Sequence, residues 1–405
     1  SKGAQIDAFT VGLGDAGDIR ISASESVSID GENSQGINSG VFTSAGVFTP
    51  GASLPGDSGD INIFTDNLFL TNGGGIGAEN RGQGNAGDIT VQAQNSILLE
   101  GVDIDGNASS ISSQLVAEAI GSAGNVTLNT NTLNLRDGSQ ISVSTFGQGN
   151  AGDLNINVPD GTVSVDGKGS KGEGSKISSE VGFSTIGDGG NIILDTETLN
   201  LTNGGKISAT TFGEGDAGEL NINAPDGKIS VYGMDSKIIA EVGSSAIGDG
   251  GNITLKAKTL NLTNNGAISA TTSGQGNAGE LTIQATDSVN LTDRGSLSTS
   301  ALSLLSGSGN NLTINTKTLN LRDGFINTTS LGQGNAGSLK ITATNSVNLD
   351  NASQIGTEAL GQSSGGELFI DTENLKIQGN SFIATSAVGW GNAGKLVLEV
   401  ADSVD

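Results

Sequence analysis

Cysteine and histidine are both absent from this 405-residue sequence, and methionine, tryptophan and tyrosine occur once each. Without thiol or imidazole groups the chain cannot build the usual zinc sites, cysteine nucleophiles or histidine-based triads. No disulfide can form, so cysteine usage does not indicate a redox compartment. Basic residues are scarce as well, since 18 Lys and Arg stand against 43 Asp and Glu and give a net charge of −25. This balance argues against nucleic acid as a partner, because no basic stripe exists to follow a phosphate backbone.

Long apolar runs are missing too. No stretch has the roughly 18 consecutive apolar residues of a membrane-spanning helix, so we expect no transmembrane segment. The first residues, SKGAQIDAFT, have no apolar region of the kind that a signal peptide carries. Glycine is abundant, with 65 residues, but it lacks the three-residue period of collagen. The abundance of glycine therefore requires another explanation, and internal repeats supply it.

A short glycine-rich string recurs along the chain. GQGNAG occurs at Gly82, Gly147, Gly274 and Gly332, with relatives such as GLGDAG at Gly12, and each is followed after one residue by Ile or Leu. A second version, such as GDGGN at Gly187, lies between them. Together the strings lead into thirteen apolar residues, which we call anchors: Ile19, Ile61, Ile89, Val126, Leu154, Ile192, Leu220, Ile253, Leu281, Leu312, Leu339, Leu368 and Leu396. A fixed step between such units is the signature of a solenoid.

The steps between anchors define two alternating coil types. Type A coils, such as the one beginning at Ile61, advance 28, 28, 28, 28, 27 and 28 residues to the next anchor. Type B coils, led by the GNAG string, advance 42, 37, 38, 33, 31 and 29 residues. Within a type A coil, apolar and small polar residues alternate in three clusters, and turn signals such as Asn264-Asn-Gly266 and Asp137-Gly138 occur between clusters. The period of two indicates strands, and no window carries a sustained helical pattern.

The repeats predict an all-β fold, a parallel β-solenoid of about thirteen coils with three strands each, forming a single repeat domain over residues 1–405. With one coil per strand spacing of about 4.8 Å, such a rod would be on the order of 60 Å long. We expect Leu199, Leu260 and Leu319 to stack inside it, with type B residues such as Val289 between them. The alternative is a β-sandwich with irregular repeats, which would need frequent hairpin turns and no fixed period.

Two long strings, Leu199–Gly227 and Thr259–Leu291, resemble the repeats of cyanobacterial filamentous-haemagglutinin-like exoproteins, which are S-layer-like β-strand-repeat proteins secreted by the two-partner route. The resemblance covers essentially the whole chain. It implies a right-handed β-helix and an extracellular or cell-surface location. The secretion domain of that family carries Asn-Pro motifs, whereas the four prolines here follow Thr49, Leu54, Val158 and Ala224.

The two ends of the sequence fall inside coils. Residues 3–12 match the third strand of a type A coil, and the final KLVLEVADSVD matches the start of a type B coil. Complete solenoids usually have atypical terminal repeats. We therefore expect either a piece of a longer array or copies of the chain stacked head to tail.

Residues that could carry catalysis are dispersed. The acidic residues are spread over all repeats, and Trp390 and Tyr232 lie far apart in sequence, unlike the clustered carboxylates and rings of a glycan-active site. The G-x-G strings lead into strands rather than helices, so we interpret their glycines as corner residues with positive φ and not as phosphate loops. We expect no enzymatic activity and no cofactor.

Calcium is the one ion that the sequence favours. The residues that precede the anchors alternate between charged and neutral from Asp88 to Asn311, which reduces repulsion between neighbouring rungs. Asp18, Asp60 and Asp88 are the exception, because they are three consecutive carboxylates. We expect them on one outer corner, within about two rungs of each other, as a weak calcium candidate.

The extra residues of type B coils predict a contact surface. We expect them after the second strand, as in residues 31–59, in a row of loops on one side of the solenoid. The first loop carries Val41, Phe42, Val47, Phe48 and Leu54, more apolar surface than a free loop usually exposes. The prediction is that deleting residues 38–54 leaves the β-helix folded.

These observations predict a secreted or cell-surface structural or adhesive filament segment. The expected partners are cell-surface or matrix components and neighbouring copies of the chain. Two alternatives remain open, a glycan-active β-helix enzyme and a calcium-dependent extracellular matrix module.

Overall fold

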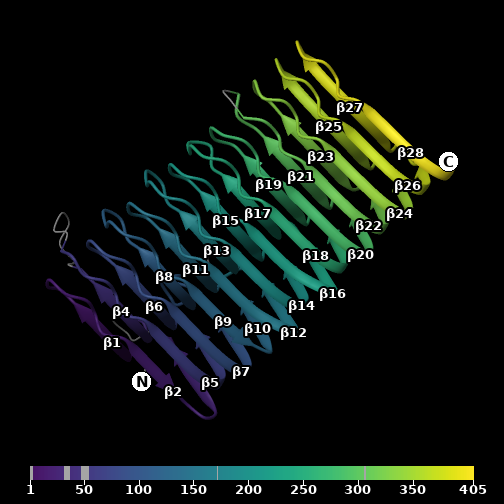
Figure 1. The fold of residues 1–405 in the computed structure, drawn as a ribbon. Coiled ribbons are helices and arrows are strands. Elements are labelled where there is room, and N and C mark those ends of the chain that lie inside the picture. The colour runs from purple at the N-terminus through teal and green to yellow at the C-terminus, as the bar shows by residue number, and fades with distance from the viewer. Residues whose placement is uncertain (1–2, 32–36, 47–53, 171, 305–306) are drawn as a thin grey trace. The chain divides into compact units, whose positions relative to one another are not determined.

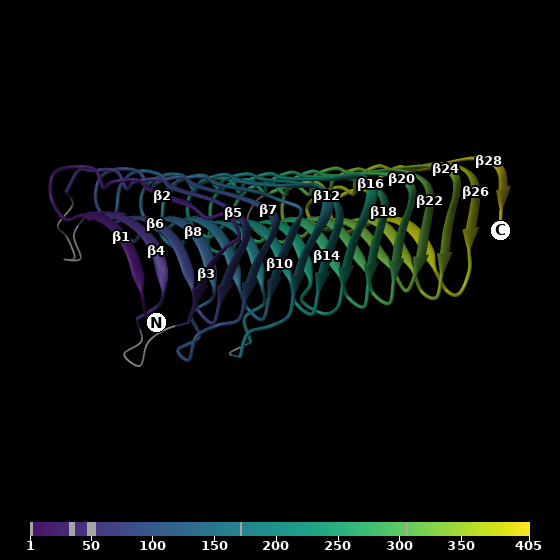
Figure 2. The ribbon, with the colours of Figure 1, turned by 90° about the horizontal axis from the view of Figure 1, so that it is seen from below.

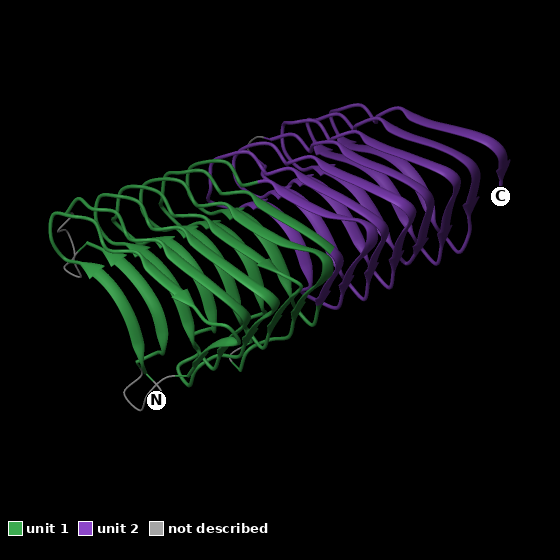
Figure 3. Ribbon diagram, turned by 60° about the horizontal axis from the view of Figure 1, so that its bottom comes forward, with its two compact units in different colours: residues 1–196, 202–218 green, residues 197–201, 219–405 purple. Residues whose placement is uncertain are grey.

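The computed structural model describes residues 3–31, 37–46, 54–170, 172–304 and 307–405. All elements in these ranges are β-strands, and none of these residues forms a helix (Figure 1). Within the same ranges, no helix has the length and hydrophobicity that crossing a membrane requires. The chain divides into two compact units (Figure 3). Unit 1 holds residues 1–196 and 202–218, and unit 2 holds residues 197–201 and 219–405.

Each unit contains two parallel sheets, one of short strands and one of long strands. The short-strand sheet of unit 1 runs in the order β1 (Gln5–Thr10), β4 (Gly40–Ala45), β6 (Gly75–Asn80), β8 (Ser110–Leu115), β11 (Gln140–Thr145), β13 (Lys176–Val181) and β15 (Lys206–Thr211). That of unit 2 runs in the order β17 (Lys237–Val242), β19 (Ala267–Thr272), β21 (Ser296–Ala301), β23 (Phe325–Ser330), β25 (Gln354–Gly361) and β27 (Phe382–Gly389).

The long-strand sheet alternates with the short one along the chain. In unit 1 it contains β2 (Ile19–Ser22), β3 (Ser26–Asp30), β5 (Ile61–Thr71), β7 (Ile89–Glu100), β9 (Val126–Thr130), β10 (Thr132–Arg136) and β12 (Leu154–Asp166). The strand β14 (Ile192–Thr202) has residues in both units. In unit 2 the sheet contains β16 (Leu220–Tyr232), β18 (Ile253–Thr263), β20 (Leu281–Thr292), β22 (Leu312–Arg322), β24 (Leu339–Asp350), β26 (Leu368–Ile377) and β28 (Leu396–Val404).

The strands stack coil on coil, as a parallel β-solenoid requires. Neighbours in each sheet pair in parallel, and the pairing of β18 with β20 begins at Ile253 and Leu281, which are both anchors. Each of the thirteen anchors is the first residue of a strand in the long-strand sheet. The all-β parallel solenoid that the repeats predict is therefore confirmed.

The number of strands in a coil differs from the prediction. In most coils the first and second predicted strands form one long strand, and within the described residues only β2 with β3 and β9 with β10 are separate. The reason is that the long strand bends without a turn. Between Ala257 and Thr259 of β18 the register with β20 shifts, so that β20 accommodates one more residue than β18. Such a bulge changes the strand direction while the backbone stays extended.

The interior is lined by residues that pair in register from one coil to the next. Leu260 pairs with Val289 and Val289 pairs with Leu319, and all three side chains are fully buried, as is Leu199. The predicted inward file is therefore confirmed. Each buried leucine contributes about 2 kcal/mol of hydrophobic stabilisation relative to an exposed one.

The turns between long and short strands also follow the sequence. Asn264 and Asp137 have φ values of 52° and 56°, in the left-handed region that Asn and Asp tolerate better than most residues. The Asp-Gly and Asn-Gly pairs thus serve the chain as corners, as expected.

Candidate functional site: corner ladders, loops and an aromatic groove

The corner before each long strand carries a ladder of side-chain oxygens. The backbone N–H of Asp60 donates to Oδ1 of Asp18 at 2.9 Å, and the N–H of Asp88 donates to Oδ1 of Asp60 at 2.8 Å. Asp18, Asp60 and Asp88 therefore lie on one corner of successive coils, and their predicted placement is confirmed. We call this row of residues, each directly before an anchor, the first corner ladder.

Asparagine performs the same task as aspartate further along the first corner ladder. Oδ1 of Asp88 accepts the N–H of Asn125 at 2.7 Å, and Oδ1 of Asn125 accepts the N–H of Asp153 at 2.9 Å. In unit 2, Oδ1 of Asn252 accepts the N–H of Glu280 at 2.9 Å. The ladder needs an oxygen acceptor rather than a charge. Neutral asparagines can therefore separate the carboxylates without breaking the chain of hydrogen bonds.

A second ladder lies three residues earlier in each coil, and the sequence analysis did not foresee it. Oδ1 of Asp15 accepts the N–H of Asp57 at 2.9 Å, and Oδ1 of Asp57 accepts the N–H of Asn85 at 2.6 Å. In unit 2 the N–H of Asn277 donates to Oδ1 of Asp249 at 2.7 Å. We call this row the second corner ladder. Its signal was present in the sequence as the Asp or Asn of every G-x-G-[ND]-A-G string.

Both ladders use the side-chain oxygens of aspartate and asparagine to accept backbone N–H donors of the neighbouring coil. Within the described ranges, no three or more acidic side chains group in a way that could hold a metal ion. Calcium binding at Asp18, Asp60 and Asp88 stays a prediction, and the established role of Oδ1 of Asp18 and Asp60 is to accept the N–H of the following coil.

The extra residues of type B coils are divided between two corners, not gathered in one loop. One part lies between long and short strands in unit 1, at residues 101–109 and at the described residues of the segments 31–39 and 167–175, and the blue and teal loops there project from the sheets (Figure 2). The other part follows the short strands, as at residues 116–125 and 182–191.

The three loops before the short strands are closed in the same way. The N–H of Ser109 donates to the carbonyl of Gly101 at 2.9 Å, while its Oγ donates to the carbonyl of Glu100 at 2.7 Å. Ser39 and Ser175 repeat both contacts at the bases of their own loops. The serine closes each loop at the surface of the sheet. Asp103 is buried against Gly73, so only the exposed residues further out, such as Ile104, can vary without disturbing the coil.

The predicted apolar loop around Phe42 requires correction. Residues 40–45 form strand β4, in which Val41 points inward and is buried at 2% exposure, and Phe42 lies on the outer face of the short-strand sheet. Val47 and Phe48 lie outside the described residues, and Leu54 is half-buried. Deleting residues 38–54 would remove β4 and a core side chain, so the interpretation of this segment as a free loop is wrong, and the deletion should destabilise the coils around β4. In this coil, extra residues before β4 place the third predicted strand further along the sequence from the second than in type A coils. For this reason β4 was interpreted as part of a loop.

A second apolar feature lies on the corner after the short strands of unit 1. The rings of Phe183 and Phe212 stack with centroids 4.8 Å apart, and a Cβ on Gly182 would meet the ring of Phe146 at 2.6 Å. Phe183 is 70% exposed and Phe146 is 39% exposed. Three phenylalanines thus follow successive short strands at one corner.

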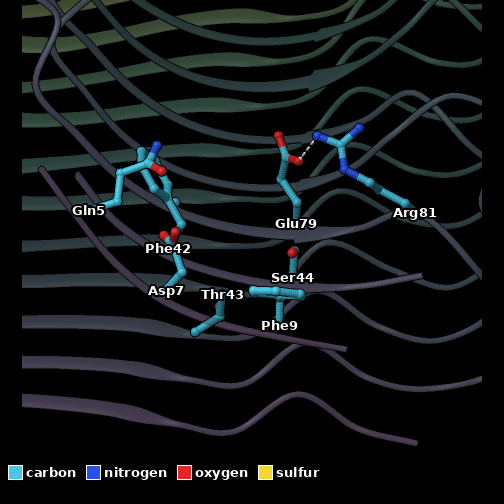
Figure 4. Close-up of a pocket in the computed structure, with 9 residues that line it drawn as sticks. Gln5, Asp7, Phe9, Phe42, Thr43, Ser44, Glu79 and Arg81 are labelled. Carbon is cyan, nitrogen blue, oxygen red and sulfur yellow. Dashed lines mark hydrogen bonds and ion pairs between the residues drawn. The ribbon is translucent and has the colours of Figure 1, made fainter. Parts of the chain in front are cut away.

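A groove opens on the outer face of the short-strand sheet where β1, β4 and β6 lie side by side (Figure 4). It encloses about 390 Å³ and is lined by side chains that include Asp7 and Phe9 of β1, Phe42 of β4 and Glu79 of β6, with Arg81 just beyond β6. Burial raises the pKa of Asp7 above its ordinary value of 3.8.

Neighbouring side chains hold Glu79 in place. Nη2 of Arg81 and Nε2 of Gln114 both donate to its carboxylate, and Arg81 and Glu79 form an ion pair. The groove therefore combines phenyl rings with fixed carboxylate and guanidinium groups. No family model, no curated protein and no solved structure matches the chain at a significant level.

Proposed function

We propose that this chain is a passive structural or adhesive segment of the cell surface, part of a secreted filamentous exoprotein. The observation that carries the proposal is that the polar corner residues form hydrogen bonds between stacked coils. Oxygens of the first corner ladder, such as those of Asp60 and Asn125, are used to bind the next coil, and the inward residues are used to fill the core. This chemistry serves a rigid scaffold.

The finer features of the proposal come from the repeats and from the resemblance to filamentous-haemagglutinin-like exoproteins. They are a right-handed winding, about thirteen coils, a single repeat domain over residues 1–405 and an extracellular location. The proposal assigns no catalytic activity and no required cofactor. Its partners are cell-surface or matrix components and neighbouring copies of the chain stacked head to tail.

The loops supply the contact surface in this proposal. Residues 101–109 and the described residues of 167–175 project at the same corner of successive type B coils, and a serine closes each loop at its base. Insertions on one face of a solenoid often mark a binding face. The sequence of these loops can therefore specify a contact while the stacked coils keep the same structure.

Surface location is tested on the cells that produce the protein. Antibodies raised against the purified chain should label intact cells, and external protease should remove the label. Labelling that appears only after the cells are broken open would contradict the proposal.

The contact role of the loops is tested by shortening. Replacing residues 104–106 with two glycines keeps Gly101, the buried Asp103 with its partner Asn107, and Ser109, and should leave the circular dichroism spectrum and the melting temperature nearly unchanged. Binding of the purified chain to envelopes of the producing cells should fall. Full binding after the same replacement in both loops would remove these loops from the proposal.

A calcium-dependent matrix module is the second candidate function, because Asp18, Asp60 and Asp88 lie on successive coils. Calcium at millimolar concentration should then raise the melting temperature, and magnesium at the same concentration should not. A variant with asparagine at Asp60 and Asp88 should lose the calcium effect. Equal melting temperatures of the wild type with and without calcium would exclude this candidate.

A further inference from the structure

The groove on the outer face of β1, β4 and β6 belongs neither to the ladders nor to the corner loops. Its volume of about 390 Å³ lies within the range of about 300–1,000 Å³ that is typical of small-molecule sites. All residues that line it lie in unit 1. The site is therefore formed by one compact unit.

The apolar part of the groove is made of two phenyl rings. Phe9 lies in the regular outward position of β1, and its side chain is 64% exposed. The ring of Phe42 lies close to the backbone of β6, where a Cβ on Gly75 or Gly77 would come within 3.2 and 3.1 Å of it. Larger residues at these two positions would push the ring away from the sheet. The glycines let the ring lie low on the sheet beside the groove.

The polar groups gather at two separate ends. Gln5 and Asp7 lie beside Phe42 at one end, and Glu79 and Arg81 lie at the other, where Phe9 is level with Glu79 because both pair with Ser44 (Figure 4). Glu79 is held by Arg81 and Gln114, so its carboxylate is oriented before any ligand arrives. Hydrogen-bonding groups thus stand on both sides of an aromatic surface.

We propose that this groove binds a neutral saccharide. The C–H face of a pyranose ring packs on an aromatic ring, while its equatorial hydroxyls need acceptors and donors around the rim, and here Phe9 supplies the ring. Asp7 and Gln5 bind the hydroxyls at one end, and Glu79 and Arg81 bind those at the other.

The charge of the groove selects among ligands. Asp7, Glu79 and Arg81 give it one net negative charge, within a chain whose net charge is −25. Anionic sugars such as uronic acids are therefore repelled. A cation would be attracted by this net charge but would also meet the guanidinium group of Arg81, whereas a neutral sugar meets no like charge at either end.

This inference goes beyond the proposed function, because the groove is formed by the outer face of β1, β4 and β6 rather than by the loops at residues 101–109 and 167–175, and it binds its ligand wherever the chain is located. Its test is made in solution with the full chain. Glucose, galactose, mannose, N-acetylglucosamine, cellobiose, lactose and chitobiose serve as probes in saturation-transfer NMR, and calorimetry measures the affinity of those that bind. We expect at least one of them to bind with a millimolar or lower Kd.

Two variants and one matched control assign the binding to the groove. Phe9→Ala should weaken binding at least about tenfold, and Glu79→Gln several-fold, since each removes one side of the site. Phe183→Ala removes an equally exposed ring from another corner of unit 1 and should leave the affinity unchanged. Melting curves confirm that all three variants fold, which the exposure of Phe9 and Phe183 favours.

Several outcomes would overturn the inference. They are no binding of any probe at 10 mM, equal binding by wild type and Phe9→Ala, or an equal loss of binding in Phe183→Ala. Tighter binding of a lysine-rich peptide or of glucuronate than of every neutral sugar would assign the groove to a charged ligand instead. None of these results depends on whether the chain lies on the cell surface.

Discussion

The last glycine of each GNAG string should be nearly irreplaceable, and Gly152 is the best place to test it. A Cβ built on Gly152 would lie 2.0 Å from the carbonyl oxygen of Gly124, the equivalent glycine one coil away. Ordinary contacts between such atoms begin near 3.4 Å, so Gly152→Ala must move two hydrogen-bonded coils apart locally by more than 1 Å. The substitution therefore acts on the stacking of coils, since no positive φ is involved at this residue.

The size of the effect follows from the hydrogen bonds beside the clash. The N–H of Ala123 donates to Asn150 at 3.0 Å, that of Val126 donates to Asp153 at 2.9 Å, and that of Asp153 donates to Asn125 at 2.9 Å. A displacement of more than 1 Å lengthens all three beyond hydrogen-bond distance. At about 1 kcal/mol each, Gly152→Ala should cost about 3 kcal/mol. In a unit of this size the melting temperature should fall by about 6–12 °C.

Gly17 provides a matched control, because it is the equivalent glycine of the coil that begins at Ile19 and a Cβ there would meet nothing within 4 Å. Gly17→Ala should leave the melting temperature within about 1–2 °C of the wild type, since substitutions away from close contacts usually change stability by under about 0.5 kcal/mol. Thermal unfolding followed by circular dichroism measures both variants. Equal destabilisation by the two substitutions would refute the close-approach argument, and so would wild-type stability of Gly152→Ala.

Two further predictions concern acidic side chains. Asp88→Ala should lower the free energy of unfolding in urea by about 1 kcal/mol, because it removes the acceptor for the N–H of Asn125 at 2.7 Å. Asp88→Asn should be neutral or stabilising, because it keeps the oxygen and relieves repulsion by Asp60. An equal loss of stability in both variants would show that the charge matters and not the acceptor. For Glu241, burial raises the pKa above the ordinary 4.5, against the lowering effects of Lys237 and Ser273, so the folded chain holds this proton more tightly than the unfolded chain. The free energy of unfolding should therefore fall as pH rises from below 4.5 through the pKa of Glu241 in the folded chain. Glu241→Gln should melt at a higher temperature than the wild type at pH 7 but not at pH 3. A lower melting temperature of the variant at pH 7 would contradict the prediction.

The features that repeat from coil to coil could be predicted from the sequence. The anchors, the inward file of Leu260, Val289 and Leu319, and the corners at Asn264 and Asp137 all follow from periodicity and from turn chemistry. They could be predicted because a parallel stack places equivalent residues in equivalent surroundings, so one coil explains the others.

Features that depend on how two coils meet were missed. The glycine pattern predicted corner residues with positive φ, which holds for Gly149 at 142°, but at Gly152 glycine is needed because the neighbouring coil approaches closely. The residues before the anchors were expected to matter through their charge, whereas the structure uses their oxygens as hydrogen-bond acceptors. Strand β4 was hidden because the preceding insertion changed its spacing, and so the outward position of Phe42 in the groove could not be foreseen.

The first corner ladder has a direction that neither sheet alone would impose. In the contacts between its rungs the side-chain oxygen belongs to the earlier coil and the N–H donor to the later one, as for Asp18 with Asp60 and Asn125 with Asp153. The side chains of this corner therefore present acceptors toward the coil that follows. The backbone bonds beside them run the other way, since the N–H of Ile61 donates to the carbonyl of Asp88 in the next coil at 2.9 Å. Each step between coils is thus held by donors and acceptors from both coils, and a cut through any rung would expose a surface that carries both kinds of group.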